Sequence, residues 1–441
     1  MSSPSEPSAV LNRAVESPLV RGGLTLVAGV LTGNLLGFAR VAAAAYLLGT
    51  HSRADSLAVA MGPIDALNSV LINSLVFAFV PLLTGRQGSE RTALFQQLTR
   101  CFFLVSAVIS LTVIVAAPAL MRALAPGLDP RYFATAVTTM RILALSTVAA
   151  GTGAIHIALL YTARRFAPTA FYQAALNTCT TVCALALWRF FGVYAFAIGY
   201  TLGAWVQLAI VRFALWRTDS CTPPPDSPSS PVRWRELLVK PAFFVVYAAG
   251  LGANIVFTRA YAPHAGPGMA AAVDYCMRGV GVPLAILVTP ISNSLLPELA
   301  RRTVKDALRL IDRTIAVTAA AAVALCAFAL IFRKPAIEIL FQHGSFTAES
   351  TRMVSAAFLG LGPSLIGWSL IEITARSLFA LNRPWLPVLA AAIPVLLNVT
   401  LTLRVHPAQP EWLGVGSSVG LLAGFLALFA LLHSARKGWS G

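Results

Sequence analysis

Two long apolar segments near the start of the chain carry charged side chains at positions where a helix facing lipid would not hold them. Residues 23–49 are long enough to cross a bilayer core of about 30 Å, and Arg40 lies more than halfway along them. The next segment, residues 55–83, carries Asp65 in its interior. A charged side chain at the centre of a membrane costs about 2.5–3.5 kcal/mol on insertion scales. We therefore expect both groups to face a protein interior or a water-filled cavity, as two walls of one polar space.

Apolar segments of similar length follow one another along the whole chain. Hydrophobic residues make up 57% of the sequence and charged residues 11%, whereas about 25% of the residues in a soluble domain are charged. The sequence therefore predicts an all-α integral membrane protein with twelve transmembrane helices. The expected spans are 23–48, 55–83, 101–125, 138–162, 167–188, 191–216, 240–262, 270–299, 314–332, 352–381, 385–404 and 412–433.

A polar stretch in the middle of the chain divides the expected spans into two sets of six. It is rich in proline, which prevents a long helix, so residues 218–239 are predicted to be a cytoplasmic linker. The linker separates an N-terminal lobe, residues 23–217, from a C-terminal lobe, residues 240–434. We expect cytoplasmic tails at both ends. Residues 1–22 lack the apolar core and cleavage site of a secretory signal, and residues 435–441 follow the last span.

Arginine and lysine in the loops predict the orientation. With both termini in the cytoplasm, most of these residues fall on the cytoplasmic side, as the positive-inside rule requires. The same distribution accounts for the net charge of +16. Because the charge is spread over many short loops, with no single basic tract, it indicates contact with anionic membrane lipids and not with nucleic acid. The outer loops receive the smaller set, Arg53, Arg122, Arg131, Arg189, Arg333, Lys334, Arg352 and Arg404.

The two halves of the chain repeat several residues at a nearly constant separation. Arg40 and Asp55 recur as Arg259 and Asp274, in both cases 219 residues later. Further pairs at similar separations are Pro81 with Pro297, Gly127 with Gly344, and Arg164 with Arg383. An even number of spans in each repeat makes the two halves parallel and relates them by an axis along the membrane normal. Transporters built in this way hold their substrate between the halves, near the middle of the membrane.

Seven charged residues within the expected spans are the candidate substrate-binding residues. They are Arg40, Asp55, Arg259, Asp274, Arg278, Glu372 and Arg376. Structural alternatives remain open for most of them. Asp55 stands at a helix start, where an acid acts as a cap, and Arg259 lies near the outer end of its span, where it would anchor the helix at the interface. Asp274 with Arg278, and Glu372 with Arg376, are four residues apart and would neutralise each other on one helix face.

Other polar groups in the spans carry no motif. We interpret Asp65, Arg141 and His156 as satisfied interior groups. Cys179 and Cys183 are four residues apart, with no histidine or acid at ligand spacing, so neither a metal nor another cofactor is expected. The sequence contains no Walker loop, which excludes ATP as the direct energy source, and no pairing of a nucleophile with a base, so we do not expect an enzyme.

Six sequence segments carry a resemblance to a known family. They are Leu-Leu-Gly-Phe-Ala-Arg (35–40), Ala-Asp-Ser-Leu-Ala-Val-Ala (54–60), Phe-Val-Pro-Leu-Leu (79–83), Leu-Leu-Pro-Glu-Leu-Ala-Arg (295–301), Leu-Phe-Gln-His-Gly-Ser-Phe-Thr-Ala-Glu-Ser-Thr (340–351) and Ser-Leu-Phe-Ala-Leu-Asn-Arg-Pro-Trp-Leu-Pro (377–387). In content and order they resemble the MurJ (MviN) family of lipid II flippases, part of the superfamily of multidrug and oligosaccharidyl-lipid exporters. The resemblance covers roughly residues 20–435.

This resemblance implies a fold and an activity. It implies two six-helix lobes in a V around a central cavity. It also implies movement of a polyprenyl-diphosphate-linked saccharide, the peptidoglycan precursor, across a bacterial inner membrane by alternating access. We expect a monomer that draws on the membrane potential or an ion gradient. Arg40, Asp55 and Arg278 fall where the family places functional charges.

The chain also departs from the family pattern. The family has fourteen spans, two more than are expected here. Gly33-Asn34 replaces an expected Ser-Arg, Asn68-Ser69 replaces an Arg-Arg pair, and Glu372 stands where a basic residue is usual. Two other functions therefore stay open. One is an exporter of another glycolipid or of a cationic drug, bound by Asp55, Asp274 and Glu372. The other is a transport-inactive scaffold in envelope synthesis.

Overall fold

A computed structural model shows that the chain folds into long helices. It describes residues 18–86, 88–163, 165, 167–216, 234–288, 291, 295, 299, 304–381, 383–404 and 409–436. Within these ranges every regular element is a helix. This result confirms the all-α fold class that the sequence predicts.

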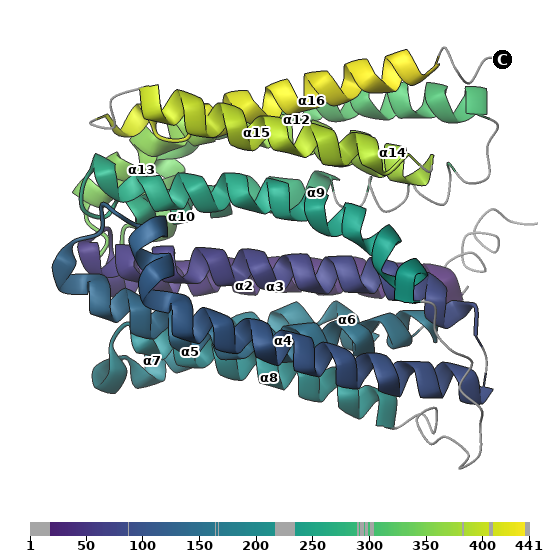
Figure 1. The fold of residues 1–441 in the computed structure, drawn as a ribbon. Coiled ribbons are helices and arrows are strands. Elements are labelled where there is room, and N and C mark those ends of the chain that lie inside the picture. Colours follow the sequence, from purple (N-terminus) through teal and green to yellow (C-terminus); the bar gives the residue numbers. More distant parts are fainter. Residues whose placement is uncertain are drawn as a thin grey trace, which may run out of the picture.

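The helices of the first half of the chain form one layer, the lower one in Figure 1. We call this layer the N lobe. Its helices are α2 (Pro18–Leu48), α3 (Ser52–Thr84), α4 (Gly88–Leu124), α5 (Pro130–Thr162), the short α6 (Ala167–Ala170), α7 (Tyr172–Phe191) and α8 (Tyr194–Trp216). Helix α5 packs against α3, α4 and α8, and 83% of its most apolar stretch is buried, so it forms the centre of this lobe.

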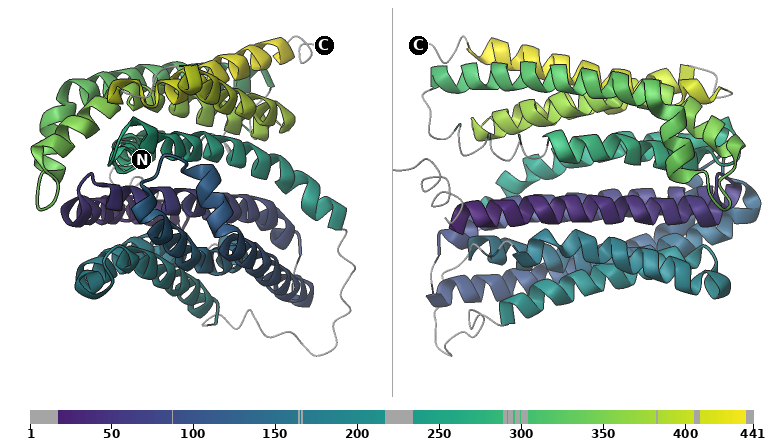
Figure 2. Two further views of the ribbon diagram at one scale, coloured as in Figure 1. Left: turned by 60° about the vertical axis from the view of Figure 1, so that its left-hand side comes forward. Right: turned by 180° about the vertical axis from the view of Figure 1, so that it is seen from behind.

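The helices of the second half form the other layer, which we call the C lobe. They are α9 (Trp234–Tyr261), η1 (Ala262–Ala265), α10 (Met269–Pro283), the π-helical η2 (Leu284–Val288), α12 (Val304–Phe341), α13 (Ala348–Leu361), α14 (Ser364–Ala380), α15 (Trp385–Arg404), η3 (Pro410–Trp412) and α16 (Val415–Arg436). The views in Figure 2 show the two layers from other sides. Helix α9 packs against both α3 and α15, and α10 also contacts α3, so these two helices join the lobes.

Ten of the described helical segments are long and apolar enough to cross a membrane. The number is eleven if α13 and α14, which meet at an angle of 43°, are one bent span. The bend falls at Pro363, which has no N–H to continue the helix. The remaining expected span, 270–299, the eighth in chain order, begins as α10 and η2, and part of it lies outside the described residues.

Several helices are longer than the sequence predicts, because the apolar pattern marks only the part within the bilayer. Helix α4 begins at Gly88 and α12 at Val304, well before the expected starts of their spans. Helix α2, described from Pro18 on, includes residues of the expected tail. Helix α9 begins at Trp234, inside the expected linker, of which residues 218–233 lie outside the described part of the chain.

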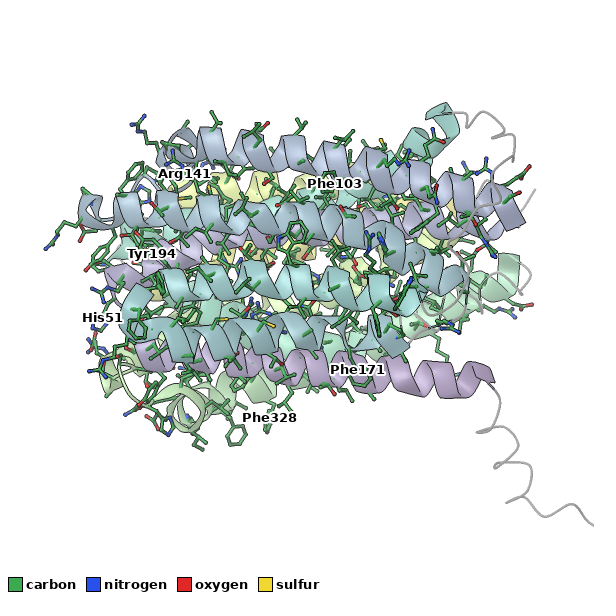
Figure 3. The ribbon with its side chains drawn as sticks, turned by 90° about the horizontal axis from the view of Figure 1, so that it is seen from below. His51, Phe103, Arg141, Phe171, Tyr194 and Phe328 are labelled. Carbon is green, nitrogen blue, oxygen red and sulfur yellow. The ribbon has the colours of Figure 1, made fainter. Side chains whose placement is uncertain are left out.

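Helices within each lobe approach closely where glycine faces a neighbour. A Cβ atom added at Gly203 of α8 would lie 2.9 Å from the Leu176 carbonyl oxygen of α7. A Cβ atom at Gly367 of α14 would lie 2.7 Å from Leu421 Cβ of α16. In lipid, apolar side chains gain little by meeting one another, so close backbone packing of this kind holds helices together. Large apolar side chains such as Phe103, Phe171 and Phe328 are instead exposed, as a lipid-facing surface requires (Figure 3).

A buried cluster of uncharged polar side chains ties three helices of the C lobe. Asn398 of α15 donates to Asn254 Oδ1 and to Thr258 Oγ1 of α9, each at 2.8 Å. Asn254 in turn donates to Ser417 Oγ of α16 at 2.7 Å. Double-mutant cycles give about 0.6 kcal/mol on average for such bonds between membrane helices. The cluster therefore fixes the register of these helices and adds modest stability.

Candidate functional site

One carboxylate oxygen at the junction of the lobes lies between two arginines. Asp65 Oδ2, from α3, is 3.9 Å from Arg40 Nη2 of α2 and 3.8 Å from Arg278 Nη2 of α10. The other oxygen, Oδ1, accepts a hydrogen bond of 2.5 Å from the Tyr200 hydroxyl of α8. The N lobe thus supplies one arginine, the acid and the tyrosine, and the C lobe supplies the second arginine. We call these four side chains the central cluster.

Arg40 is the most buried member of the central cluster. The residue is 5% exposed, and its Nη1 has no hydrogen-bond partner within the described part of the chain. Its guanidinium carbon lies 5.8 Å from the centroid of the Tyr200 ring, within the range of a cation–π interaction. A buried guanidinium that leaves donors unused costs free energy unless another group binds it. Arg40 is therefore placed to bind an anion.

A second ion pair lies beside the central cluster. Arg259 of α9 donates to Asp274 of α10. A Cβ atom at Gly62 would lie 3.0 Å from Arg259 Cδ, so the glycine in α3 leaves room for the arginine side chain where the two lobes meet. With 11% of its side chain exposed, Arg259 is an interior residue. The interpretation of Arg259 as an interfacial anchor is wrong, because its charge has a carboxylate partner inside the protein.

The ion pairs also differ from the pairing that the four-residue spacing predicts. Asp274 and Arg278 lie one turn apart on α10, but Asp274 binds Arg259 and Arg278 faces Asp65. Packing brings an arginine of α9 and an acid of α3 against α10, and these partners replace the neighbour on the same helix. Glu372 and Arg376 of α14 do pair at 2.6 Å, as their spacing predicts.

The space next to Arg40 is small in this conformation. A cavity of about 30 Å³ is lined by Arg40 and Asp274 together with mainly apolar side chains, among them Met61 and Phe196. A cavity needs at least about 10–15 Å³ on this measure to hold one water molecule. In this conformation the site therefore has room for only about two water molecules.

Asp55 binds backbone N–H groups of the other lobe. Its carboxylate accepts hydrogen bonds from the backbone N–H groups of Gly268, at 2.6 Å, and Ala271, at 3.0 Å. These donors belong to the first turn of α10, so Asp55 of the N lobe caps a helix of the C lobe. The residue is 2% exposed. The sequence predicted a capping role as the alternative for Asp55, but at the start of its own helix.

Further hydrogen bonds join the lobes at the same end of the molecule. Tyr275 donates to the Gly49 carbonyl at 2.9 Å, and Thr50 donates to Ser350 Oγ at 2.8 Å. The Ser345 N–H donates to the Tyr46 carbonyl at 2.8 Å. We call the contacts of residues 46–55 with residues 268–275 and 345–350 the interlobe latch. Figure 3 shows His51 at one end of the bundle, where Arg141 and Tyr194 also lie.

The latch depends on backbone shapes that glycine adopts easily. Gly49 has a φ of 59° and Gly268 a φ of 86°, both in the left-handed region. A side chain on Gly268 would also collide with the Thr50 carbonyl. The two glycines therefore let the chain segments of the two lobes meet closely.

Two of the three groups that we interpreted as satisfied interior residues are paired and shielded. His156 is buried, with Nδ1 2.9 Å from the Thr152 carbonyl oxygen. Asp65 is paired as well, and its partners are two of the candidate arginines. The prediction for Arg141 is wrong, because its side chain is exposed and donates to the Ile114 carbonyl. That carbonyl has no helical donor, since Pro118 lies four residues later in α4.

The sequence did not single out Tyr200, which lies in the middle of an ordinary apolar span. The only available signal was the mid-span position of Arg40 and Asp65, which predicted that the two would face one polar space. Across the ranges that the structure describes, no group of three His, Cys, Asp or Glu side chains could hold a metal ion.

Comparisons with known proteins agree on one family. The family model described as "Lipid II flippase MurJ" matches residues 44–440. The chain is 26% identical over 452 residues to the "Probable lipid II flippase MurJ" of Rhizobium meliloti, covering 96% of this chain and 81% of that protein. It is 27% identical over 453 residues to the "Lipid II flippase MurJ" of Burkholderia cenocepacia, covering 96% and 86%.

Solved structures show the same fold. "Lipid II flippase MurJ, inward closed conformation" matches with a TM-score of 0.81 at 16% identity, covering 93% of this chain and 87% of that one. An inward-facing multidrug resistance transporter of the MATE family matches with a TM-score of 0.74 at 14% identity, covering 91% and 96%. At these identities the likeness concerns the fold alone.

Proposed function

The chain belongs to the MurJ family of lipid II flippases, and from this we propose that it moves a lipid II-like, polyprenyl-diphosphate-linked saccharide across a bacterial inner membrane. The observation that carries the proposal is the meeting of Arg40 and Arg278, one from each lobe, on a single oxygen of Asp65. A diphosphate offers several such oxygens. Guanidinium groups bind phosphate oxygens through paired N–H donors, and binding by two lobes couples the ligand to their movement.

We assign the diphosphate to Arg40 and Arg278, with Arg259 as a third candidate. Arg40 supports the assignment because it is buried with an unused donor. Arg259 has a close carboxylate partner, so it contributes only if Asp274 releases it. Glu372 and Arg376 pair with each other on α14. They stay predicted contacts for the rest of the headgroup.

The proposed transport cycle is alternating access between the lobes. The latch lies at the end of the bundle that the loop charges predict to be the outer one, and the cavity beside Arg40 is water-sized. We therefore interpret this conformation as closed toward the outside, with a cavity too small for the headgroup. The headgroup would enter from the cytoplasmic side when the lobes separate there, and it would leave when the latch opens.

The membrane potential is the proposed energy source. A diphosphate carries about two negative charges, and an inside-negative potential favours outward movement of an anion by about 2.3 kcal/mol per charge per 100 mV. No coupling ion is then required. We further propose that the protein acts as a monomer, without a cofactor and without catalysis, and that both termini are cytoplasmic.

Two other functions, a cation exporter and a transport-inactive scaffold, can be compared with the structure. An exporter of cations would bind its substrate through Asp55, Asp274 and Glu372, yet Asp274 and Glu372 pair with arginines and Asp55 binds backbone N–H groups. These contacts disfavour that alternative. The small cavity favours a transport-inactive scaffold, but a closed conformation also appears among structures titled as flippases. A closed cavity is thus compatible with transport.

The test is rescue of growth. A bacterium whose own lipid II flippase is depleted should grow when this gene is expressed at the same membrane level as a functional family member. If the protein is inserted normally and growth does not recover, lipid II is not its substrate. If the protein instead confers resistance to cationic drugs, the exporter function is correct.

A further inference from the structure

We propose that Asp65 is an internal counter-anion, which occupies the place of a substrate phosphate in the empty transporter and leaves it when the diphosphate binds. The inference rests on the proposed function, because it takes the ligand to be a diphosphate. It adds a residue that sets the affinity of the site.

The distances in the central cluster favour an exchange of anions. Asp65 Oδ2 lies 3.8 and 3.9 Å from the two arginine nitrogens, whereas an N–H···O hydrogen bond spans about 2.7–3.2 Å. The arginines are therefore attracted by the carboxylate without being hydrogen-bonded to that oxygen. Arg40 also keeps Nη1 without a partner in the described part of the protein. Arg40 thus retains a donor that a better acceptor would engage.

Tyr200 gives the Asp65 carboxylate a hydrogen-bond partner besides the two arginines. Its hydroxyl donates to Asp65 Oδ1 at 2.5 Å, much closer than either arginine approaches Oδ2. Asp65 can therefore lose the arginines and keep a hydrogen bond. The hydrogen bond from Tyr200 therefore lets the carboxylate separate from Arg40 and Arg278 without becoming an acid that has no partner.

The charges explain why such a group is useful. Arg40 and Arg278 approach the same point from different lobes, so without an anion they would repel each other. Asp65 reduces their combined charge from +2 to +1, while Arg259 and Asp274 neutralise each other. Any anion that binds both arginines must first displace Asp65, so the carboxylate lowers the affinity of the site. A diphosphate offers the arginines more charge than the carboxylate does and can still replace it, with binding that stays weak enough for release.

The experiment measures binding of farnesyl diphosphate and farnesyl monophosphate, which share one tail, to the full-length protein in nanodiscs. Asp65→Asn should bind the diphosphate at least about tenfold more tightly than wild type, a ratio that corresponds to about 1.4 kcal/mol. It should also bind the monophosphate more tightly, by a similar factor, because displacing Asp65 costs the same free energy for both probes. Asp65→Glu keeps the negative charge and should stay near the wild type. Asp129→Asn removes an acid that caps α5 within the N lobe, and it should change neither affinity.

Tyr200→Phe provides a second variant in case Asp65→Asn does not fold. It keeps the acid but removes the partner that stabilises Asp65 once the arginines leave it, so it should weaken the binding of both probes by several fold. Unchanged affinities in Tyr200→Phe would contradict the proposal. A merely structural role for Asp65 predicts weaker binding of both probes in Asp65→Asn and Asp65→Glu as well.

The outcomes separate this inference from the proposed function. If Arg40→Ala and Arg278→Ala lose the diphosphate while Asp65→Asn binds it no more tightly than wild type, Asp65 is not a competing anion and the arginine site stands. If neither the wild type nor Asp65→Asn binds farnesyl diphosphate, both proposals fail. Tighter binding by Asp65→Asn that disappears in the Arg278→Ala background supports both.

Discussion

Replacing Asp55 with Asn should release the outer ends of the two lobes. The carboxylate accepts two backbone hydrogen bonds from α10 and complements the positive end of that helix. Asn keeps one acceptor but presents an NH₂ group to the other N–H. Loss of one charge-assisted hydrogen bond costs about 1.5–3 kcal/mol, and the interaction with the helix end adds about 0.3–1 kcal/mol. Since water solvates these groups when the latch opens, we expect a net shift of about 2–3 kcal/mol, or roughly 30- to 150-fold, toward the opened latch.

Labelling of a cysteine inside the latch measures this shift. Ala54 is buried and lines the cavity beside Arg40, so a cysteine there, in a background without native cysteines, reports opening. A membrane-impermeant maleimide added from the outside should label Ala54→Cys slowly, and at least about tenfold faster when Asp55→Asn is also present. Asp129→Asn removes an acid that caps a helix within one lobe, and it should leave the rate unchanged. Equal labelling rates with and without the Asp55→Asn substitution would show that the capping bonds do not hold the lobes together.

Two further predictions concern the energy source and the second ion pair. An inside-negative potential imposed with valinomycin should accelerate flipping of a diphosphate lipid in proteoliposomes, because about two charges gain about 2.3 kcal/mol each per 100 mV; dependence on a proton gradient alone would contradict this. Gly62→Ala should reduce rescue of the depleted bacterium as Arg259→Ala does, since the new Cβ lies 3.0 Å from Arg259 Cδ, and Gly252→Ala, whose Cβ meets Ala66 at 3.7 Å, is the matched control. Full activity of Gly62→Ala would show that the position of Arg259 is unimportant.

The sequence predicted the helices well because membrane insertion depends on local properties. Length and hydropathy are enough to recognise a span, so the expected spans correspond to described helices, except for the part of 270–299 outside the described residues. The expectation that Arg40 and Asp65 face one polar space is also confirmed, with the two charges 3.9 Å apart. The cost of a charge in lipid carries that prediction without any knowledge of the neighbouring helices.

Ion pairs and hydrogen bonds between different helices were harder to predict, because they depend on the packing of residues that are far apart in the chain. The spacing of Asp274 and Arg278 predicts one pair, but Arg259 reaches Asp274 because Gly62 leaves room in another helix. Asp55 caps a helix whose first turn lies more than 200 residues away. Nothing local to Tyr200 distinguishes it from other tyrosines in apolar spans, although it holds the central acid.

The most direct test of the account measures flipping of a polyprenyl-diphosphate-linked saccharide by purified Arg40→Ala, Arg278→Ala and the corresponding lysine variants in proteoliposomes. The alanine variants should insert at normal levels, because Asp65 keeps one arginine and Tyr200 as partners in each of them. Each should lose at least about tenfold in rate, as expected for one charge-assisted bond of about 1.5–3 kcal/mol. Lysine keeps the charge without the paired donors, so it should recover only part of the rate. If both alanine variants flip the lipid at the wild-type rate, the diphosphate does not bind between Arg40 and Arg278.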